Sequence, residues 1–176
     1  MRELTIGIDI GGTNTKYGIV DRVGNVVSQG SISTTQYEEF KDYFHGLADA
    51  LRKEINAIPG ENKIIGVGVG AANGNYYKGT IERATNLKWK GIIPLADMFQ
   101  EEFDLPAIVT NDANAAAVGE MVYGAAQGMK DFVVITLGTG LGSGFVSNGQ
   151  LLNGKHGIAG EVGHTSVNPA GRFCNC

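Results

Sequence analysis

The feature that most constrains this chain is a strand, a glycine turn and a second strand within residues 4–21. Apolar residues alternate with small or polar ones over residues 4–10, at the period of two that is typical of a strand, and extended structure resumes at Tyr17. No helix follows the glycines, as a dinucleotide fingerprint requires, and no Gly-Lys-Ser/Thr sequence closes the turn, as in a Walker loop. The sequence therefore predicts a hairpin closed by a glycine turn.

The turn itself is suited to a phosphate group. Gly11 and Gly12 carry no Cβ, so their backbone N–H groups can approach phosphate oxygens closely. Short polar side chains and one ammonium group complete the turn: Thr13, Asn14, Thr15 and Lys16. Asp9, at the end of the first strand, is placed to hold Mg²⁺ through water, because magnesium keeps most of its hydration and takes few carboxylates. An ordinary hairpin with glycines in its turn is the alternative.

The same order of elements returns later in the chain. Residues 131–137 read as an apolar strand, a second glycine turn begins at Gly138, Thr139 and Gly140, and a further strand starts at Phe145. Two such turns in matching contexts indicate a duplicated architecture with a nucleotide between the two turns.

Between the two hairpins the chain alternates helices and strands. Residues 40–58 carry apolar side chains at three- and four-residue spacing, and Pro59 ends this predicted helix. Residues 63–70 read as a buried strand. Alternation of this kind predicts an α/β fold in which active groups lie at the carboxyl ends of strands.

A polar segment, residues 71–89, follows directly after one of these strand ends. Such a loop is well placed to touch a ligand. Asn73 and Asn86 could hydrogen-bond a polyol, and Trp89 could cover the apolar face of a sugar. A hairpin with a packed tryptophan is the alternative for Trp89.

The next strand end carries the candidate catalytic group. Asn111 and Asp112 follow a brief strand, residues 105–110, and open a helix that runs to about Gln127. A carboxylate beside an amide that can orient a hydroxyl is what phosphorylation of an alcohol needs, since the carboxylate accepts the proton as the oxygen attacks the γ-phosphate. Capping of the helix is the alternative role, and both roles are compatible.

Composition limits the partners of the protein. Fourteen basic and 18 acidic residues give a net charge of −4 without a basic tract, which argues against nucleic acid. Residues 132–154 carry no charge, but glycines interrupt the run too often for a membrane helix. Nothing near Met1 resembles a signal peptide. We therefore expect a cytoplasmic protein without nucleic-acid or membrane partners.

Taken together, these motifs resemble the ROK family of sugar kinases and related repressors, within the actin-like ATPase superfamily, over almost the whole chain. Residues 9–13 resemble the first phosphate motif of the family, residues 111–114 its catalytic segment, and residues 137–144 its second phosphate motif. Residues 159–164, followed by residues 174–176, resemble its zinc and sugar signature.

The resemblance implies a glucokinase-like enzyme that uses ATP and Mg²⁺ to phosphorylate the primary hydroxyl of a hexose. Asp112 would then be the base, and Asn111, Glu161 and His164 would hold sugar hydroxyls. Asn73 is a further candidate for sugar binding because of its place in the polar loop.

The resemblance also implies a structural Zn²⁺ ion bound by His164, Cys174 and Cys176. A closed structural site needs four ligands, and the chain supplies only these three candidates. His156 is interpreted as an ordinary loop histidine.

For the architecture, the resemblance implies an actin-like (ribonuclease H-like) α/β domain over residues 1–117, with a mixed sheet and flanking helices. The start of a second, similar domain would occupy residues 118–176. We expect the chain to end within that domain, to bind nucleotide poorly as it stands, and to form a homodimer in its full-length form. The sugar-contacting loop departs from the family pattern at residues 72–74 and at Thr85, where family members often carry proline.

Several alternatives stay open. Fructose, mannose, allose or an N-acetylhexosamine could replace glucose as the acceptor. A sugar-responsive regulator of the ROK type would carry a helix-turn-helix ahead of the first strand, which here begins at Leu4. A non-catalytic sugar-binding module would tolerate loss of Asp9 or Asp112, and both are present.

Overall fold

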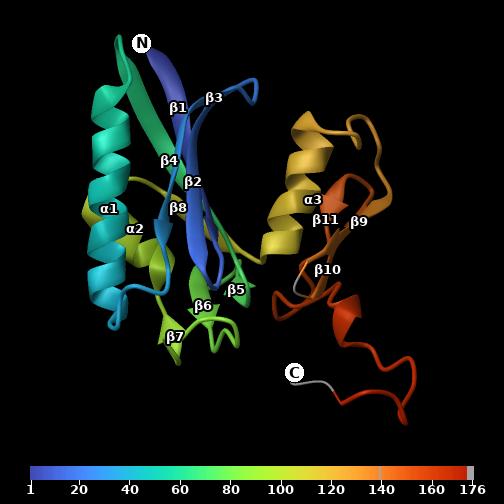
Figure 1. Cartoon of the computed structure of the whole chain (residues 1–176). Helices are drawn as coiled ribbons and strands as arrows, with labels where there is room; N and C mark the ends of the chain where they lie inside the picture. Colours follow the sequence, from blue (N-terminus) through green and yellow to red (C-terminus); the bar gives the residue numbers. More distant parts are fainter. Residues whose placement is uncertain (139, 174–176) are drawn as a thin grey trace. The chain divides into compact units, whose positions relative to one another are not determined.

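The structure, a computed structural model, describes residues 1–138 and 140–173 (Figure 1). The chain divides into two compact units, Met1–Asp112 and Ala113–Cys176, and each is described by itself. The domain boundary expected between residues 117 and 118 remains a prediction about the whole protein.

A five-stranded sheet forms the centre of the first unit, in the order β3-β2-β1-β4-β8. Its strands are β1 (Arg2–Ile10), β2 (Asn14–Asp21), β3 (Val26–Ser33), β4 (Asn62–Ala71) and β8 (Ala107–Thr110). β1, β2 and β3 form an antiparallel meander, whereas β4 runs parallel to both β1 and β8. Asp9 pairs with Gly70 and Gly70 with Thr110, so the carboxyl ends of the three parallel strands lie at one edge of the sheet.

Two helices, α1 (Phe40–Ala57) and α2 (Leu95–Phe103), pack on the same side of this sheet (Figure 1). The apolar stripe predicted for α1 is buried, and the rings of Phe44 and Phe99 join the two helices edge to face at 5.1 Å. Alternate residues of β1, from Leu4 to Ile10, face the same core. Because full burial of one such side chain stabilises a fold by about 1.5–3 kcal/mol, this layer is the main source of stability for the unit.

A small antiparallel sheet follows β4 along the chain. It consists of β5 (Gly74–Asn75), β6 (Thr80–Glu82) and β7 (Ile92–Ile93). Trp89, from the loop between β6 and β7, packs 4.6 Å from the ring of Tyr43 and donates its indole N–H to the carbonyl of Glu38 at 2.8 Å. The interpretation of Trp89 as a cover for a sugar is therefore wrong, and the packed alternative is confirmed, because the residue is only 9% exposed.

The second unit contains α3, a three-stranded sheet and a short 3-10 helix. Its elements are α3 (Asp112–Tyr123), β9 (Phe132–Leu137), β10 (Leu141–Ser147), β11 (Gln150–Leu151) and η1 (Val162–His164). The sheet is antiparallel throughout, in the order β11-β10-β9, as the strand, turn, strand pattern predicted. α3 ends four residues before the predicted Gln127, because residues after Tyr123 turn back and their N–H groups bond to Glu120.

None of the helices within residues 1–138 and 140–173 has both the length and the apolar character that a bilayer crossing requires.

Candidate functional site

The candidate site lies at the edge of the five-stranded sheet where the parallel strands end. Asp9 comes from β1, Asn73 follows β4, and Asn111 and Asp112 follow β8. The chain that follows β4 passes very close to the end of β8. A Cβ at Gly74 would overlap the carbonyl of Thr110. A glycine is therefore required there for steric reasons.

The carboxylates of Asp9 and Asp112 interact electrostatically across this edge of the sheet. The pKa of Asp9 is raised above its usual value, first by loss of hydration through burial and second by the negative charge of Asp112, while the Lys16 ammonium acts in the opposite direction. Lys16 pairs with Asp9 in the β1–β2 register. Repulsion between two carboxylates is relieved by a cation, and hard oxygen ligands of this kind fit Mg²⁺.

The first glycine turn closes the β1–β2 hairpin, whose last register pair is Ile10 and Thr15. The N–H of Gly11 donates to the carbonyl of Asn14 at 3.1 Å. The Gly11 amide thus shapes the turn itself. The phosphate contacts predicted for Gly11, Gly12 and Thr13 stay predictions.

Gly12 has a steric role of its own. A Cβ at this position would lie 2.7 Å from the backbone oxygen of Asn86 in the loop between β6 and β7. Real Cβ atoms need about 3.4 Å or more, so only glycine lets this loop lie against the turn. The backbone of the loop at Asn86 thus contacts the turn.

A buried cluster of three hydroxyl groups, Thr15, Thr34 and Tyr43, supports the turn from the core side. The Thr15 Oγ1 atom lies 2.9 Å from Thr34 Oγ1 and 2.7 Å from the Tyr43 hydroxyl. The N–H of Thr34 donates to the carbonyl of Thr13 at 2.9 Å, and burial raises the pKa of Tyr43. Sequence reasoning missed this cluster, although Thr15 stands at an inward position of the alternating β2 pattern.

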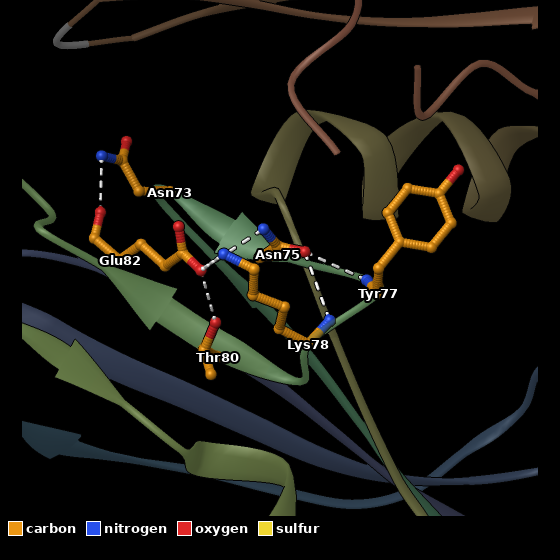
Figure 2. A network of polar contacts seen from close by, with 6 residues as sticks. All are labelled: Asn73, Asn75, Tyr77, Lys78, Thr80 and Glu82. Atoms are coloured by element: carbon orange, nitrogen blue, oxygen red, sulfur yellow. Dashed lines mark hydrogen bonds and ion pairs between the residues drawn. The ribbon is translucent and has the colours of Figure 1, made fainter. Parts of the chain in front are cut away.

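Asn73 adopts a left-handed backbone conformation with φ 57°, and its amide nitrogen donates to the carbonyls of Glu82 at 2.9 Å and Arg83 at 3.4 Å. Figure 2 shows this contact beside the Glu82 carboxylate, on which side-chain donors converge. The donors are Lys78 at 2.9 Å, Thr80 at 3.1 Å and Asn75 at 3.4 Å. Asn73 therefore organises the loop, and only its amide oxygen could accept a bond from a sugar hydroxyl.

The glycines of the second turn fall into two groups. A Cβ at Gly138 or Gly140 would meet no atom within 4 Å. A Cβ at Gly144 would lie 2.6 Å from the Cβ of Ala117, and one at Gly142 would lie 3.0 Å from the Cβ of Ala113. The later glycines thus allow α3 to pack on β10, and only Gly138 and Gly140 have the open surroundings expected of a phosphate-binding turn.

Thr139, between these two glycines, was also predicted to bind phosphate, and it lies outside the described residues.

Glu161 and His164 are brought together by η1, with His164 Nε2 3.9 Å from Glu161 Oε2. The segment is fixed to β10 because the Ser143 hydroxyl donates to the carbonyl of Gly160 and accepts from the N–H of Val162 at 3.3 Å. Both side chains are partly exposed and hence accessible to a ligand.

The predicted zinc ligands Cys174 and Cys176 lie outside the described residues. Across the described part of the chain, no three His, Cys, Asp or Glu side chains gather in a way that could hold a metal ion. His164 is placed as described above, and the zinc site remains a prediction.

A mixed α/β sheet that carries two interacting carboxylates and a glycine turn at the ends of its strands has the fold of the actin-like ATPases. The sequence model of the ROK family matches residues 5–176, so the chain belongs to the ROK family.

Relatives of more than one kind are similar to it, a glucokinase and a repressor among them. A glucokinase of Halalkalibacterium halodurans is 41% identical over 174 residues, which cover 97% of this chain and 52% of the relative. A xylose repressor of Caldicellulosiruptor bescii is 34% identical over 174 residues, which cover 97% of this chain and 43% of the repressor.

Among solved structures, a ROK family glucokinase from Streptomyces griseus in complex with glucose and AMPPNP superimposes with a TM-score of 0.80 and 38% identity, covering 98% of this chain and 54% of that one. The chain thus spans about half the length of the curated relatives it matches.

Proposed function

We propose that the protein is a sugar kinase that transfers the γ-phosphate of ATP to the primary hydroxyl of a hexose, as a glucokinase does. The observation that carries this proposal is the electrostatic interaction of Asp9 with Asp112 at the sheet edge that also presents the first glycine turn. The glucokinase relatives and the relative solved with glucose and AMPPNP support the same activity.

In this mechanism the two carboxylates have different roles. Asp112 accepts the proton of the sugar hydroxyl while the hydroxyl oxygen attacks the γ-phosphorus, and ADP leaves with the electron pair of the broken P–O bond. Asp9 is the residue that would hold Mg²⁺, and the ion would supply positive charge to the phosphate oxygens. Lys16, opposite Asp9, adds a second positive charge. Catalysis then depends mainly on positioning and electrostatics.

The phosphates are proposed to contact Gly12, Thr13 and Asn14 in the first turn. Gly11 contributes through the shape of the turn, because its N–H is bonded to Asn14. In the second turn, Gly138, Thr139 and Gly140 are the proposed phosphate contacts, and Gly138 also contributes through the shape of its turn, because its N–H donates to the carbonyl of Gly140 at 3.0 Å.

The sugar is proposed to contact Asn111, Glu161, His164 and the amide oxygen of Asn73. Asn111 precedes the base directly in the chain, and Glu161 and His164 form a pair of partly exposed polar groups suited to hydroxyls. We also propose that the whole protein is a cytoplasmic homodimer and that Cys174 and Cys176 bind zinc together with His164.

A sugar-responsive regulator is the second candidate, because the xylose repressor of Caldicellulosiruptor bescii is 34% identical to this chain. A regulator needs the sugar contacts but not the proton transfer at Asp112. The two candidates therefore differ in phosphate transfer, not in sugar binding.

The test is incubation of the protein with MgATP and a panel of glucose, fructose, mannose, allose and N-acetylated hexosamines, with detection of sugar phosphate by mass spectrometry. A kinase yields ADP and a sugar phosphate in equal amounts for at least one sugar. Saturable sugar binding without any phosphorylated product would favour the regulator.

A further inference from the structure

The loop between β6 and β7 is organised around the ammonium group of Lys90. Its Nζ atom donates to three backbone carbonyls, those of Leu87 at 2.6 Å, Ala84 at 3.0 Å and Thr85 at 3.3 Å. A lysine ammonium carries three N–H donors, and here each of them meets a carbonyl of the same loop. The Lys90 side chain thus ties together the carbonyls of residues 84, 85 and 87, while the side chains of Ala84 and Leu87 are buried in the core.

Asn86, which lies between Thr85 and Leu87 in this loop, contacts the first glycine turn. The Asn86 oxygen lies 2.7 Å and its Cβ 3.7 Å from the place that a Cβ of Gly12 would take. The turn and the loop are therefore in direct backbone contact, so a displacement of one changes the space open to the other.

The two ends of the loop are fixed without Lys90. The N–H of Arg83 donates to the carbonyl of Gly91 at 2.7 Å. The Asn73 amide nitrogen donates to the carbonyl of Glu82 (Figure 2) and to that of Arg83. The middle of the loop lies outside regular secondary structure. Among the described contacts, the Lys90 ammonium holds three carbonyls of this part of the loop at once.

We propose that Lys90 is a positioning residue that presses the loop of residues 84–87 onto Gly12 and so keeps the first turn in the shape that binds the phosphates of a nucleotide. This inference rests on the proposed kinase function. Lys90 itself contacts neither nucleotide nor sugar in this account, and it acts through the backbone of Asn86.

The test uses Lys90→Met, which keeps the length and apolar character of the side chain but removes the ammonium group. Lys88→Met is the matched control, because Lys88 belongs to the same loop and its Nζ bonds only outward, to Glu38 Oε1 at 3.0 Å, among the described contacts. Lys90→Gln, which retains an amide donor, is measured beside them so that a methionine variant that fails to fold does not end the test.

The first readout is hydrogen exchange followed by mass spectrometry, which reports local opening. For Lys90→Met we expect exchange about tenfold faster both in the loop peptide over residues 84–87 and in the turn peptide over residues 9–16, with a smaller increase for Lys90→Gln. Lys88→Met should exchange as the unsubstituted protein does. Faster exchange in the loop with an unchanged turn peptide would overturn the inference.

The second readout is binding of MgATP and of glucose, each by calorimetry. Lys90→Met should weaken MgATP binding about tenfold and leave glucose binding within about twofold, a split that general destabilisation would not produce. Equal loss for both ligands, or no loss for MgATP, contradicts the positioning role. These affinities are measured on the whole protein. If the unsubstituted whole protein binds no MgATP, the kinase proposal fails, and the exchange data then decide the structural role of Lys90 separately.

Discussion

The glycines of the second turn allow a sharp prediction, because a substitution at Gly144 should disturb the packing of α3 on β10 and one at Gly138 should not. The change is Gly144→Ala, and the matched control is Gly138→Ala. The new methyl at position 144 would lie 2.6 Å from the Cβ of Ala117 and 2.7 Å from the carbonyl oxygen of Ala113, whereas one at Gly138 would meet nothing within 4 Å.

The magnitude follows from the missing space. Two carbon atoms attract best at about 3.5–4.0 Å, so α3 and β10 would have to separate by roughly 1 Å. Overpacking of this kind costs about 1–3 kcal/mol, and alanine returns about 0.4–1 kcal/mol by restricting the unfolded chain. The net expectation for Gly144→Ala is a loss on the order of 1–2 kcal/mol in the free energy of unfolding.

The assay is urea denaturation followed by circular dichroism, with tryptophan fluorescence as a second probe. Trp89 is the only tryptophan of the chain and belongs to the first unit, so fluorescence reports on that unit. Gly144→Ala should lower the midpoint seen by circular dichroism, and Gly138→Ala should leave it unchanged or raise it slightly. Equal destabilisation by both substitutions would refute the division of the glycines into two groups.

Three further predictions concern the first unit. Asp9→Asn should stabilise the protein at pH 7 and not at pH 3. The pKa of Asp9 is raised, so the folded protein loses stability as the carboxyl ionises with rising pH, and asparagine cannot ionise. Urea titrations at both pH values measure the difference. Asp21→Asn should destabilise the protein above about pH 4, and the difference should vanish as pH falls toward 2, because the bond from Arg2 lowers the pKa of Asp21 to about 2. Tyr43→Phe should cost about 1 kcal/mol in urea unfolding, since Thr15 loses a buried hydrogen-bond partner.

Much of the first unit follows from local pattern. The alternation of apolar residues in β1 and the helical stripe of α1 predict which side chains are buried, because both periods are fixed by backbone geometry. The alternation of strands and helices also predicted active groups at the carboxyl ends of strands, and Asp9 and Asp112, 103 residues apart in sequence, interact electrostatically there. These predictions needed no knowledge of contacts between residues distant in sequence.

The remaining features depend on contacts that no local pattern reveals. A glycine that leaves room for a ligand and one that leaves room for a packed helix look the same in sequence. The predicted phosphate motif of residues 137–144 therefore included Gly144, which the structure packs against α3. The bond between Thr15 and Tyr43, and the burial of Trp89 against Tyr43, join elements that become neighbours only after the sheet and α1 pack.

The most direct measurement of the central claim compares Asp112→Asn with the unsubstituted form of the whole protein in a coupled kinase assay, together with the affinity for the sugar. Loss of a general base should lower turnover about 100- to 10,000-fold and leave sugar affinity nearly unchanged. Turnover that persists in Asp112→Asn while sugar affinity is lost would show that Asp112 binds the sugar and does not activate it.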